Sequence, residues 1–312
     1  MAPPKHPEVD VQRIRADDGT ELTLRSTGRG PTALLCAGLG GSWRAWSHQV
    51  AYLGDRLRFV SWDPRGFYDS SPPADANAVG VAQHARDALA VLDAAEAERA
   101  LLFGWSMGVP VALELFRRAP ERVAGLVLVA GTADGARFGL GARFPWVAER
   151  GGLLARLTSP WMQRLGDAAW LLESLTRRIA DAPEAQRWAQ RLGLVSRDLD
   201  EASFDAVAQD LKAVDLRTWV RTFEALRRHD ARDVLPEIDV PTLVLAGGRD
   251  AFVPASEAAR LADAIPGAER MVVPEATHFV ALEAPELVNL RVEKFLRERG
   301  ASLRDVGSEL DT

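Results

Sequence analysis

A single serine lies between two glycines where an apolar run changes from a strand-like to a helix-like pattern. Gly104, Ser106 and Gly108 form the pattern G-x-S-x-G within LLFGWSMGVPVALELF, residues 101 to 116. The run before the serine reads as a buried strand, and the run after it reads as a helix. The glycines let the backbone turn sharply, so the serine hydroxyl would project from the carboxyl edge of a sheet. This placement predicts a nucleophile.

A serine hydroxyl needs a base, and the base needs a carboxylate to orient it. Of the five histidines, His278 in PEATHFVALEAPE follows the last predicted strand and precedes the last predicted helix. Asp250, in GGRDAFVP, follows the strand PTLVLA. We therefore predict that Ser106, Asp250 and His278 form a catalytic triad. Asp134, just after the strand AGLVLV, is the alternative acid.

The elements that must position these residues alternate along the chain. Eight β-branched runs are predicted strands, and most of them from the third onward precede a helical pattern. Continuous apolar strands that alternate with helices predict an α/β fold, with a mostly parallel eight-stranded sheet covered by helices on both faces. The first two strands, joined by ADDGT, predict a hairpin at one edge. The eight runs are residues 9–14, 21–26, 32–36, 57–62, 99–104, 124–129, 241–246 and 270–274.

The alternation stops for roughly 100 residues that read as helices only. We expect a core domain of residues 1–133 and 234–312 and an inserted helical cap, or lid, of residues 134–233. Five of the nine tryptophans lie in this insertion, and most of them are expected to pack it onto the core. Some would line an apolar substrate pocket. The candidates for that pocket are Trp105, Trp146 and Trp170.

The order of nucleophile, acid and histidine makes the chain resemble the α/β-hydrolase superfamily over nearly its whole length apart from the insertion. The resemblance implies the α/β-hydrolase fold and an oxyanion hole made of two backbone amides. Carried over to this sequence, these are the N–H groups of Leu39, in CAGLGGSW, and Met107. It also implies a serine esterase that forms an acyl-enzyme, because superfamily dehalogenases and epoxide hydrolases would have aspartate at position 106.

Three other reactions would use the same triad: acyl transfer to another acceptor, perhydrolysis, and cleavage of a carbon–carbon bond. A receptor that binds a ligand without consuming it is an alternative from another class. Binding alone would not need a serine, an acid and a base together. The sequence leaves open the natural substrate, the acyl length and the oligomeric state.

Two stretches depart from the superfamily pattern. Ala37 and Gly38 stand where relatives commonly have His-Gly, so one supporting side chain is missing before the oxyanion residue. WDPRGFYDSS resembles the pattern D-x-R-G-x-G-x-S, but Tyr68 replaces its second glycine. We expect Tyr68 to reshape this loop, and the alternative is that its side chain faces the pocket.

The composition excludes several other functions. The chain has 312 residues, 47% of them apolar, and a formal net charge of -6, with basic residues scattered rather than clustered. We therefore expect a small-molecule ester as partner, no nucleic acid and no stable membrane association. No signal peptide or membrane-spanning run is recognisable, which predicts a cytoplasmic protein.

Trp43 interrupts a possible G-x-G-x-x-G, and no phosphate or metal motif is present, so neither cofactor nor metal is expected. Cys36 is expected to be a buried, reduced thiol.

Overall fold

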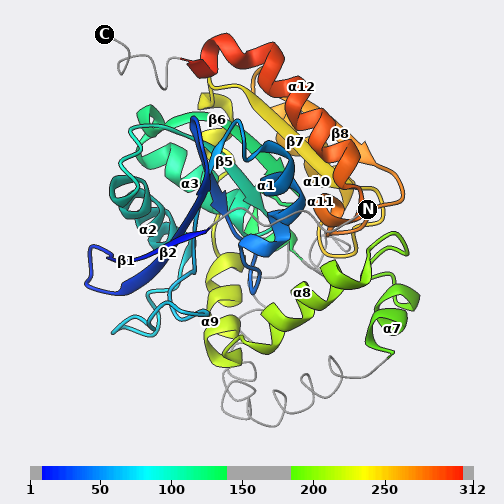
Figure 1. Ribbon diagram of the computed structural model, residues 1–312, viewed down its shortest axis with the longest axis horizontal. Coiled ribbons are helices and arrows are strands. Elements are labelled where there is room, and N and C mark those ends of the chain that lie inside the picture. The colour runs from blue at the N-terminus through cyan, green and yellow to red at the C-terminus, as the bar shows by residue number, and fades with distance from the viewer. Residues whose placement is uncertain (1–8, 139–183, 305–312) are drawn as a thin grey trace.

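The computed structural model describes residues 9–138 and 184–304 (Figure 1). They contain an eight-stranded sheet in the order β1-β2-β4-β3-β5-β6-β7-β8. Strands β1 and β2 form an antiparallel hairpin at one edge, β2 is antiparallel to β4, and the other neighbours are parallel. The predicted mostly parallel sheet and edge hairpin are confirmed. The strands are β1 (Asp10–Arg15), β2 (Glu21–Gly28), β3 (Thr32–Cys36), β4 (Arg58–Trp62), β5 (Ala100–Trp105), β6 (Val123–Val129), β7 (Thr242–Gly247) and β8 (Glu269–Val273).

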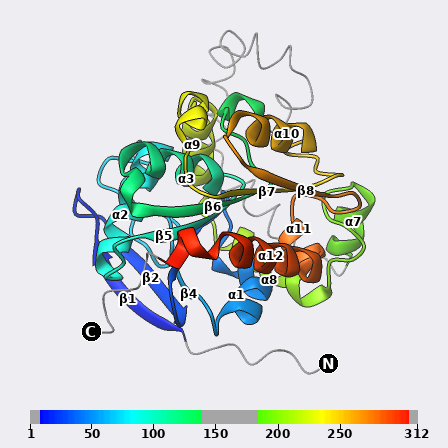
Figure 2. The ribbon, with the colours of Figure 1, turned by 90° about the horizontal axis from the view of Figure 1, so that it is seen from above.

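Helices cover both faces of this sheet, as Figure 2 shows. One layer contains α1 (Ser47–Leu53), α11 (Val280–Glu283) and α12 (Pro285–Arg304), and the other contains α2 (Val81–Ala94), α3 (Gly108–Arg118) and α10 (Ala255–Ala264). Connections include the short 3₁₀ helices η1 (Trp43–Trp46), η2 (Pro120–Arg122), η3 (Gly135–Arg137) and η4 (Arg232–Glu237). Because the sheet is covered on both faces, its central strands read as continuous apolar runs.

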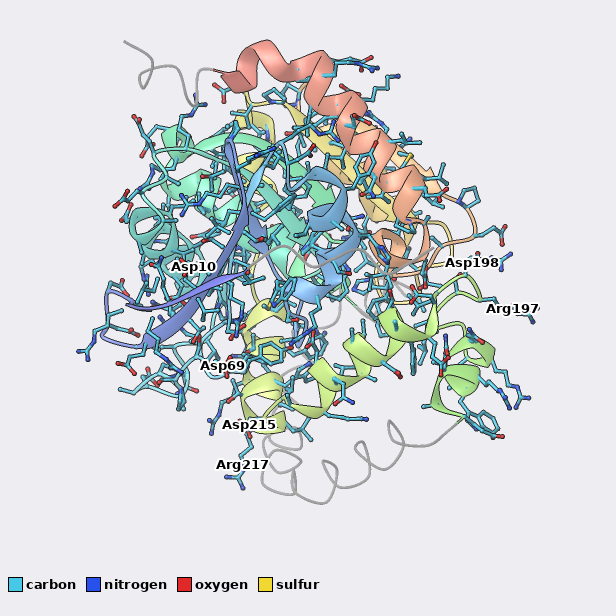
Figure 3. All side chains as sticks on the ribbon, viewed as in Figure 1. Asp10, Asp69, Arg197, Asp198, Asp215 and Arg217 are labelled. Carbon is cyan, nitrogen blue, oxygen red and sulfur yellow. The ribbon has the colours of Figure 1, made fainter. Side chains whose placement is uncertain are left out.

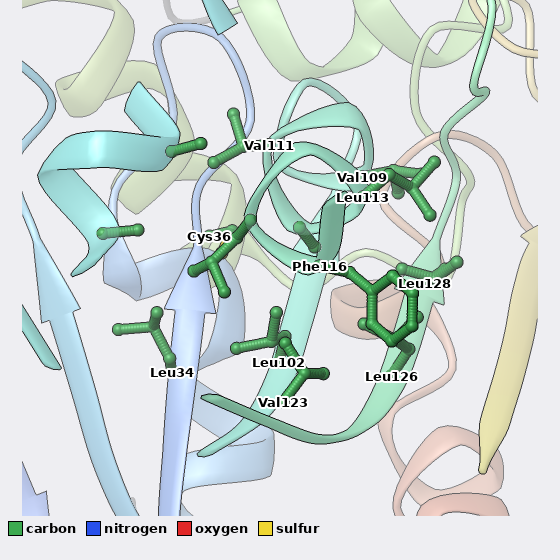
Figure 4. Packing of buried hydrophobic residues seen from close by; sticks show 14 of the residues in the cluster. Leu34, Cys36, Leu102, Val109, Val111, Leu113, Phe116, Val123, Leu126 and Leu128 are labelled. Atoms are coloured by element: carbon green, nitrogen blue, oxygen red, sulfur yellow. The ribbon is translucent and has the colours of Figure 1, made fainter. Parts of the chain in front are cut away.

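The sheet separates the two larger apolar clusters of the described core. Every residue of β3, β5 and β6 is buried, and successive side chains point to opposite faces. Leu34, Leu102 and Leu128 therefore pack towards α2 and α3 (Figure 4), while Phe103 packs in the cluster on the other face. Cys36 lies in the first cluster, where burial raises the pKa of its thiol to about 12.

Among the described residues, three α-helices lie between β6 and β7 in the sequence: α7 (Ala185–Arg191), α8 (Glu201–Lys212) and α9 (Leu216–Arg227). We call these the inserted helices. The carboxylates of Asp200 and Asp215 cap α8 and α9 by accepting hydrogen bonds from the first turn of each helix. Arg197, between α7 and α8, and Arg217, on α9, are exposed at the outside of this part of the molecule (Figure 3). No helix in the described ranges is both long and apolar enough to cross a bilayer.

Candidate active site

Ser106 lies at the turn between β5 and α3, in a backbone conformation that side chains rarely adopt. Its φ is +56°, and its amide donates a hydrogen bond to the Val129 carbonyl at 2.9 Å. A Cβ atom at Gly108 would lie 1.9 Å from the Cys36 carbonyl oxygen. Only glycine at position 108 therefore lets α3 begin this close to β3, and the tight turn directs the hydroxyl away from the sheet.

The structure brings the three predicted triad residues together. His278 Nε2 lies 2.9 Å from Ser106 Oγ, and His278 Nδ1 lies 2.7 Å from Asp250 Oδ2. The other Asp250 oxygen accepts hydrogen bonds from the amides of Phe252 at 2.8 Å and Val253 at 2.9 Å. The two imidazole nitrogens thus have different partners, and all three side chains are buried. This is the geometry in which an imidazole takes a serine proton while a carboxylate holds the opposite N–H.

The alternative acid has other partners. Asp134 accepts a hydrogen bond from the Ala136 amide at 3.1 Å and pairs with Arg137 at 3.2 Å, at the start of η3. Its carboxylate therefore caps a short helix. Of the two acids considered from the sequence, Asp250 is the one that contacts His278.

A second group of serine, histidine and aspartate occurs where α1 faces α8. His48 Nε2 lies 3.3 Å from Ser203 Oγ and 3.9 Å from an oxygen of Asp200. Both contacts use the same imidazole nitrogen. A triad requires the serine and the carboxylate to face opposite nitrogens, so this group is not arranged for proton transfer and offers a useful control.

The predicted oxyanion amides belong to the two turns beside Ser106. Within the described ranges, neither the Leu39 nor the Met107 N–H donates a hydrogen bond to a protein atom. Trp105 connects these turns to the histidine loop, because its indole N–H donates to the His278 carbonyl at 3.0 Å. A Cβ at Gly41 would lie 2.4 Å from the Trp105 ring. The oxyanion loop, which we define as residues 37–42, therefore packs directly against this indole.

Ser106 and His278 open into an apolar cavity of about 370 Å³. Aromatic rings from the core and the inserted helices dominate its lining, and Trp219 stacks on Phe223 with ring centroids 5.3 Å apart. Among the described lining residues, Asp210 and His278 are the ionisable ones. The lining residues that bear on the chemistry are Leu39, Trp105, Asp210, Trp219, Phe223, Phe252 and Phe279.

These observations agree with comparisons to known proteins. Residues 31–285 match the model of the alpha/beta hydrolase fold family. The chain belongs to this family. A relative from Rhizobium rhizogenes, named provisionally as the carbamate hydrolase RutD, is 29% identical over 86% of this chain and 93% of its own. The pimeloyl-[acyl-carrier protein] methyl ester esterase of Vibrio campbellii is 27% identical over 88% of this chain and 98% of its own.

A solved structure supports the same assignment of this α/β hydrolase. The crystal structure of a hydrolase from Pseudomonas aeruginosa PA01 is similar with a TM-score of 0.71 and 26% identity, covering 92% of this chain and 98% of that one. Within the described part of this hydrolase, no group of three or more His, Cys, Asp or Glu side chains could hold a metal ion.

The motif D-x-R-G of this hydrolase fixes the loop after β4. Arg65 is fully buried and donates to Asp87 Oδ2 at 2.8 Å and Asp18 Oδ2 at 2.6 Å. Ser70 donates to the Asp63 carbonyl at 2.6 Å. The motif is therefore structural, and it sets the position of the loop that carries Tyr68.

Several residues of the site were not predicted from the sequence. Of the three tryptophans predicted for a substrate pocket, Trp105 lines this cavity, and Trp146 and Trp170 lie outside the described residues. Among the described residues of the insertion, Asp210, Trp219 and Phe223 line the cavity. The i, i+4 spacing of the two aromatic residues was a usable signal, because it places both rings on one face of a helix. No sequence signal distinguished Asp210 from other acidic residues of the insertion.

Proposed function

We propose that this α/β hydrolase cleaves carboxylic esters through an acyl-enzyme on Ser106. The observation that carries this proposal is the hydrogen-bonded chain from Asp250 through His278 to Ser106, which ends at an apolar cavity. A protein that only binds a ligand would not require these two hydrogen bonds. The Vibrio campbellii relative, named as a methyl ester esterase, supports the same class of substrate.

In the proposed reaction, Ser106 Oγ attacks the ester carbonyl carbon while His278 Nε2 takes the hydroxyl proton. Asp250 accepts the Nδ1–H hydrogen bond and stabilises the imidazolium that forms. Collapse of the tetrahedral intermediate breaks the bond to the alcohol, which leaves with the proton from His278. Water then attacks the acyl-serine, with His278 as its base, and releases the carboxylic acid.

The negative oxygen of each tetrahedral intermediate would be held by the Leu39 and Met107 amides. Met107 directly precedes α3, so the partial positive charge at the helix N-terminus acts in the same direction. Neither amide has a protein partner within the described ranges, so both are free to donate to substrate. Donors of this kind contribute about 10²- to 10³-fold to kcat.

The cavity favours an uncharged, apolar acyl or alcohol group of small to medium size. Its described lining provides no Lys or Arg to neutralise an anionic substrate, and it includes the carboxylate of Asp210. Burial raises the pKa of Asp210, and its oxygens already accept hydrogen bonds from Ser42 and Arg44. We therefore expect p-nitrophenyl butyrate or hexanoate to be a better substrate than the corresponding hemisuccinate.

A fluorophosphonate probe with peptide mapping tests the proposal, together with hydrolysis of a graded series of p-nitrophenyl esters. The wild type should carry one adduct at Ser106, and Ser106→Ala should lose both labelling and hydrolysis while its Tm stays near that of the wild type. Ser203→Ala is the matched control, because its hydroxyl also contacts a histidine. An unlabelled wild type, or an active Ser106→Ala enzyme, would contradict the proposal. Product analysis with alcohol and peroxide as competing acceptors separates hydrolysis from acyl transfer.

A further inference from the structure

The oxyanion loop has one backbone hydrogen bond of its own across Leu39, from the Gly41 amide to the Gly38 carbonyl at 3.0 Å. Three of its six residues are glycine, and Gly40 has a φ of +73°. Glycine loses more backbone freedom than any other residue when it is fixed in one conformation. Ala37 provides no polar side chain at the start of the loop. Beyond the Gly41–Gly38 bond, the direction of the Leu39 amide therefore depends on contacts from outside the loop.

One such contact comes from Tyr68, in the loop after β4. Its hydroxyl donates a hydrogen bond to the Gly40 carbonyl at 2.8 Å. Burial raises the pKa of Tyr68, so the hydroxyl keeps its proton and remains a donor. Its φ is +51°, so it keeps the backbone conformation that suits the glycine of the motif.

The sequence offered two interpretations of Tyr68, a reshaped loop or a side chain facing the pocket. Neither describes its main contact. Tyr68 is absent from the described residues that line the cavity, and its hydroxyl reaches the neighbouring oxyanion loop instead. Removing that hydroxyl therefore removes no atom of a residue that lines the described cavity.

A second contact comes from Asp210 on α8, one of the inserted helices. Its Oδ2 accepts hydrogen bonds from the Ser42 amide at 3.1 Å and from the Ser42 hydroxyl at 2.5 Å. Its Oδ1 accepts one from Arg44 at 3.0 Å. Asp210 is 5% exposed and Ser42 is 3% exposed, so water does not compete readily for these bonds.

We propose that Tyr68 and Asp210 are positioning residues that together hold the oxyanion loop, so that the Leu39 amide points at the oxygen that becomes negative. The inference rests on the proposed function. An oxyanion donor must lie within about 2.7–3.1 Å of that oxygen, and the two contacts hold Gly40 and Ser42, which follow Leu39 by one and three residues. Loosening the loop therefore weakens transition-state stabilisation more than it weakens substrate binding.

The test compares the rates at which Ser106 reacts with a fluorophosphonate. In this reaction Ser106 Oγ forms a bond to phosphorus, the P–F bond breaks with loss of fluoride, and the serine proton passes to His278 and then to solvent. The phosphoryl oxygen occupies the place of the oxyanion. We expect Tyr68→Phe to slow labelling about five- to tenfold, the effect of one hydrogen bond of ordinary net strength. With p-nitrophenyl butyrate, kcat should fall by the same factor while KM stays within about twofold.

Tyr52→Phe is the matched control. Tyr52 is the only other tyrosine of the chain, and its hydroxyl also makes one hydrogen bond, to Glu293 at 2.7 Å on the outside of α12. Labelling of Tyr52→Phe should match the wild type. If Tyr68→Phe does not fold, Ser42→Ala provides the second test, because it removes the hydroxyl bond to Asp210 and should also slow labelling.

The outcomes separate this inference from the proposed function. If the wild type is not labelled, both the proposed function and this inference are contradicted. A labelled wild type with Tyr68→Phe reacting at the same rate overturns the inference alone. A Tyr68→Phe enzyme with raised KM and unchanged kcat also overturns it, because Tyr68 would then act in substrate binding.

Discussion

Buried His84 is expected to make the protein less stable in mild acid. It lies on α2, is 1% exposed, and its Nδ1 is 3.9 Å from Asp87 Oδ2. Burial lowers the pKa of His84 from 6.5 to about 4, although the nearby Asp87 carboxylate favours the protonated imidazole and acts in the opposite direction. Below about pH 6.5 the unfolded chain therefore binds a proton that the folded protein does not accept until about pH 4. At 1.36 kcal/mol for each pKa unit, the shift corresponds to on the order of 3 kcal/mol of the free energy of unfolding. This contribution is present above pH 6.5 and is lost as the pH falls to about 4.

The assay is urea denaturation of wild type and His84→Gln between about pH 7.5 and pH 4.5. The free energy of unfolding should fall more steeply with acid in the wild type, by up to about 1.4 kcal/mol for each pH unit. Val91→Ala, also buried on α2, is the control: it should lower this free energy by about 2 kcal/mol at every pH and leave the slope unchanged. Parallel pH profiles for wild type and His84→Gln would refute the reasoning.

Three further predictions follow from contacts at the site. Asp250→Asn should lower kcat about 10⁴-fold on p-nitrophenyl butyrate, whereas Asp134→Asn should stay within about twofold of wild type; the reverse result would assign the acid to Asp134. Gly108→Ala should cost about 3 kcal/mol of stability or more in urea denaturation, against about 1 kcal/mol for Gly193→Ala, where no atom lies within 4 Å of the added Cβ. Trp105→Phe keeps a ring but removes the bond to the histidine loop, so kcat should fall about fivefold, and an unchanged kcat would mean that the bond does not position that loop.

The grouping of Ser106, Asp250 and His278 could be predicted because it depends on the direction of the strands. Each residue follows a strand of the parallel part of the sheet, and the carboxyl ends of parallel strands meet at one edge. The apolar runs identify those strands without any knowledge of their neighbours. The choice between Asp250 and Asp134 needed coordinates, because both follow strands and only the distance to His278 separates them.

The contacts that hold the oxyanion loop could not be predicted in the same way. The bond between Tyr68 and Gly40 joins two loops whose relative position depends on the buried ion pairs of Arg65. Asp210 reaches Ser42 from a helix 168 residues further along the chain. Helical periodicity identifies the apolar face of such a helix, but it does not say which part of the core that face covers.

Ser106 and His278 are 172 residues apart in the chain, although their reacting atoms lie 2.9 Å apart. During synthesis the serine turn therefore leaves the ribosome long before its partner, and the pair forms only after β7 and β8 have joined the sheet. A covalent probe added at intervals during refolding would modify only molecules in which these distant segments have met. The extent of labelling at Ser106 would then measure how many molecules have completed the sheet at each time.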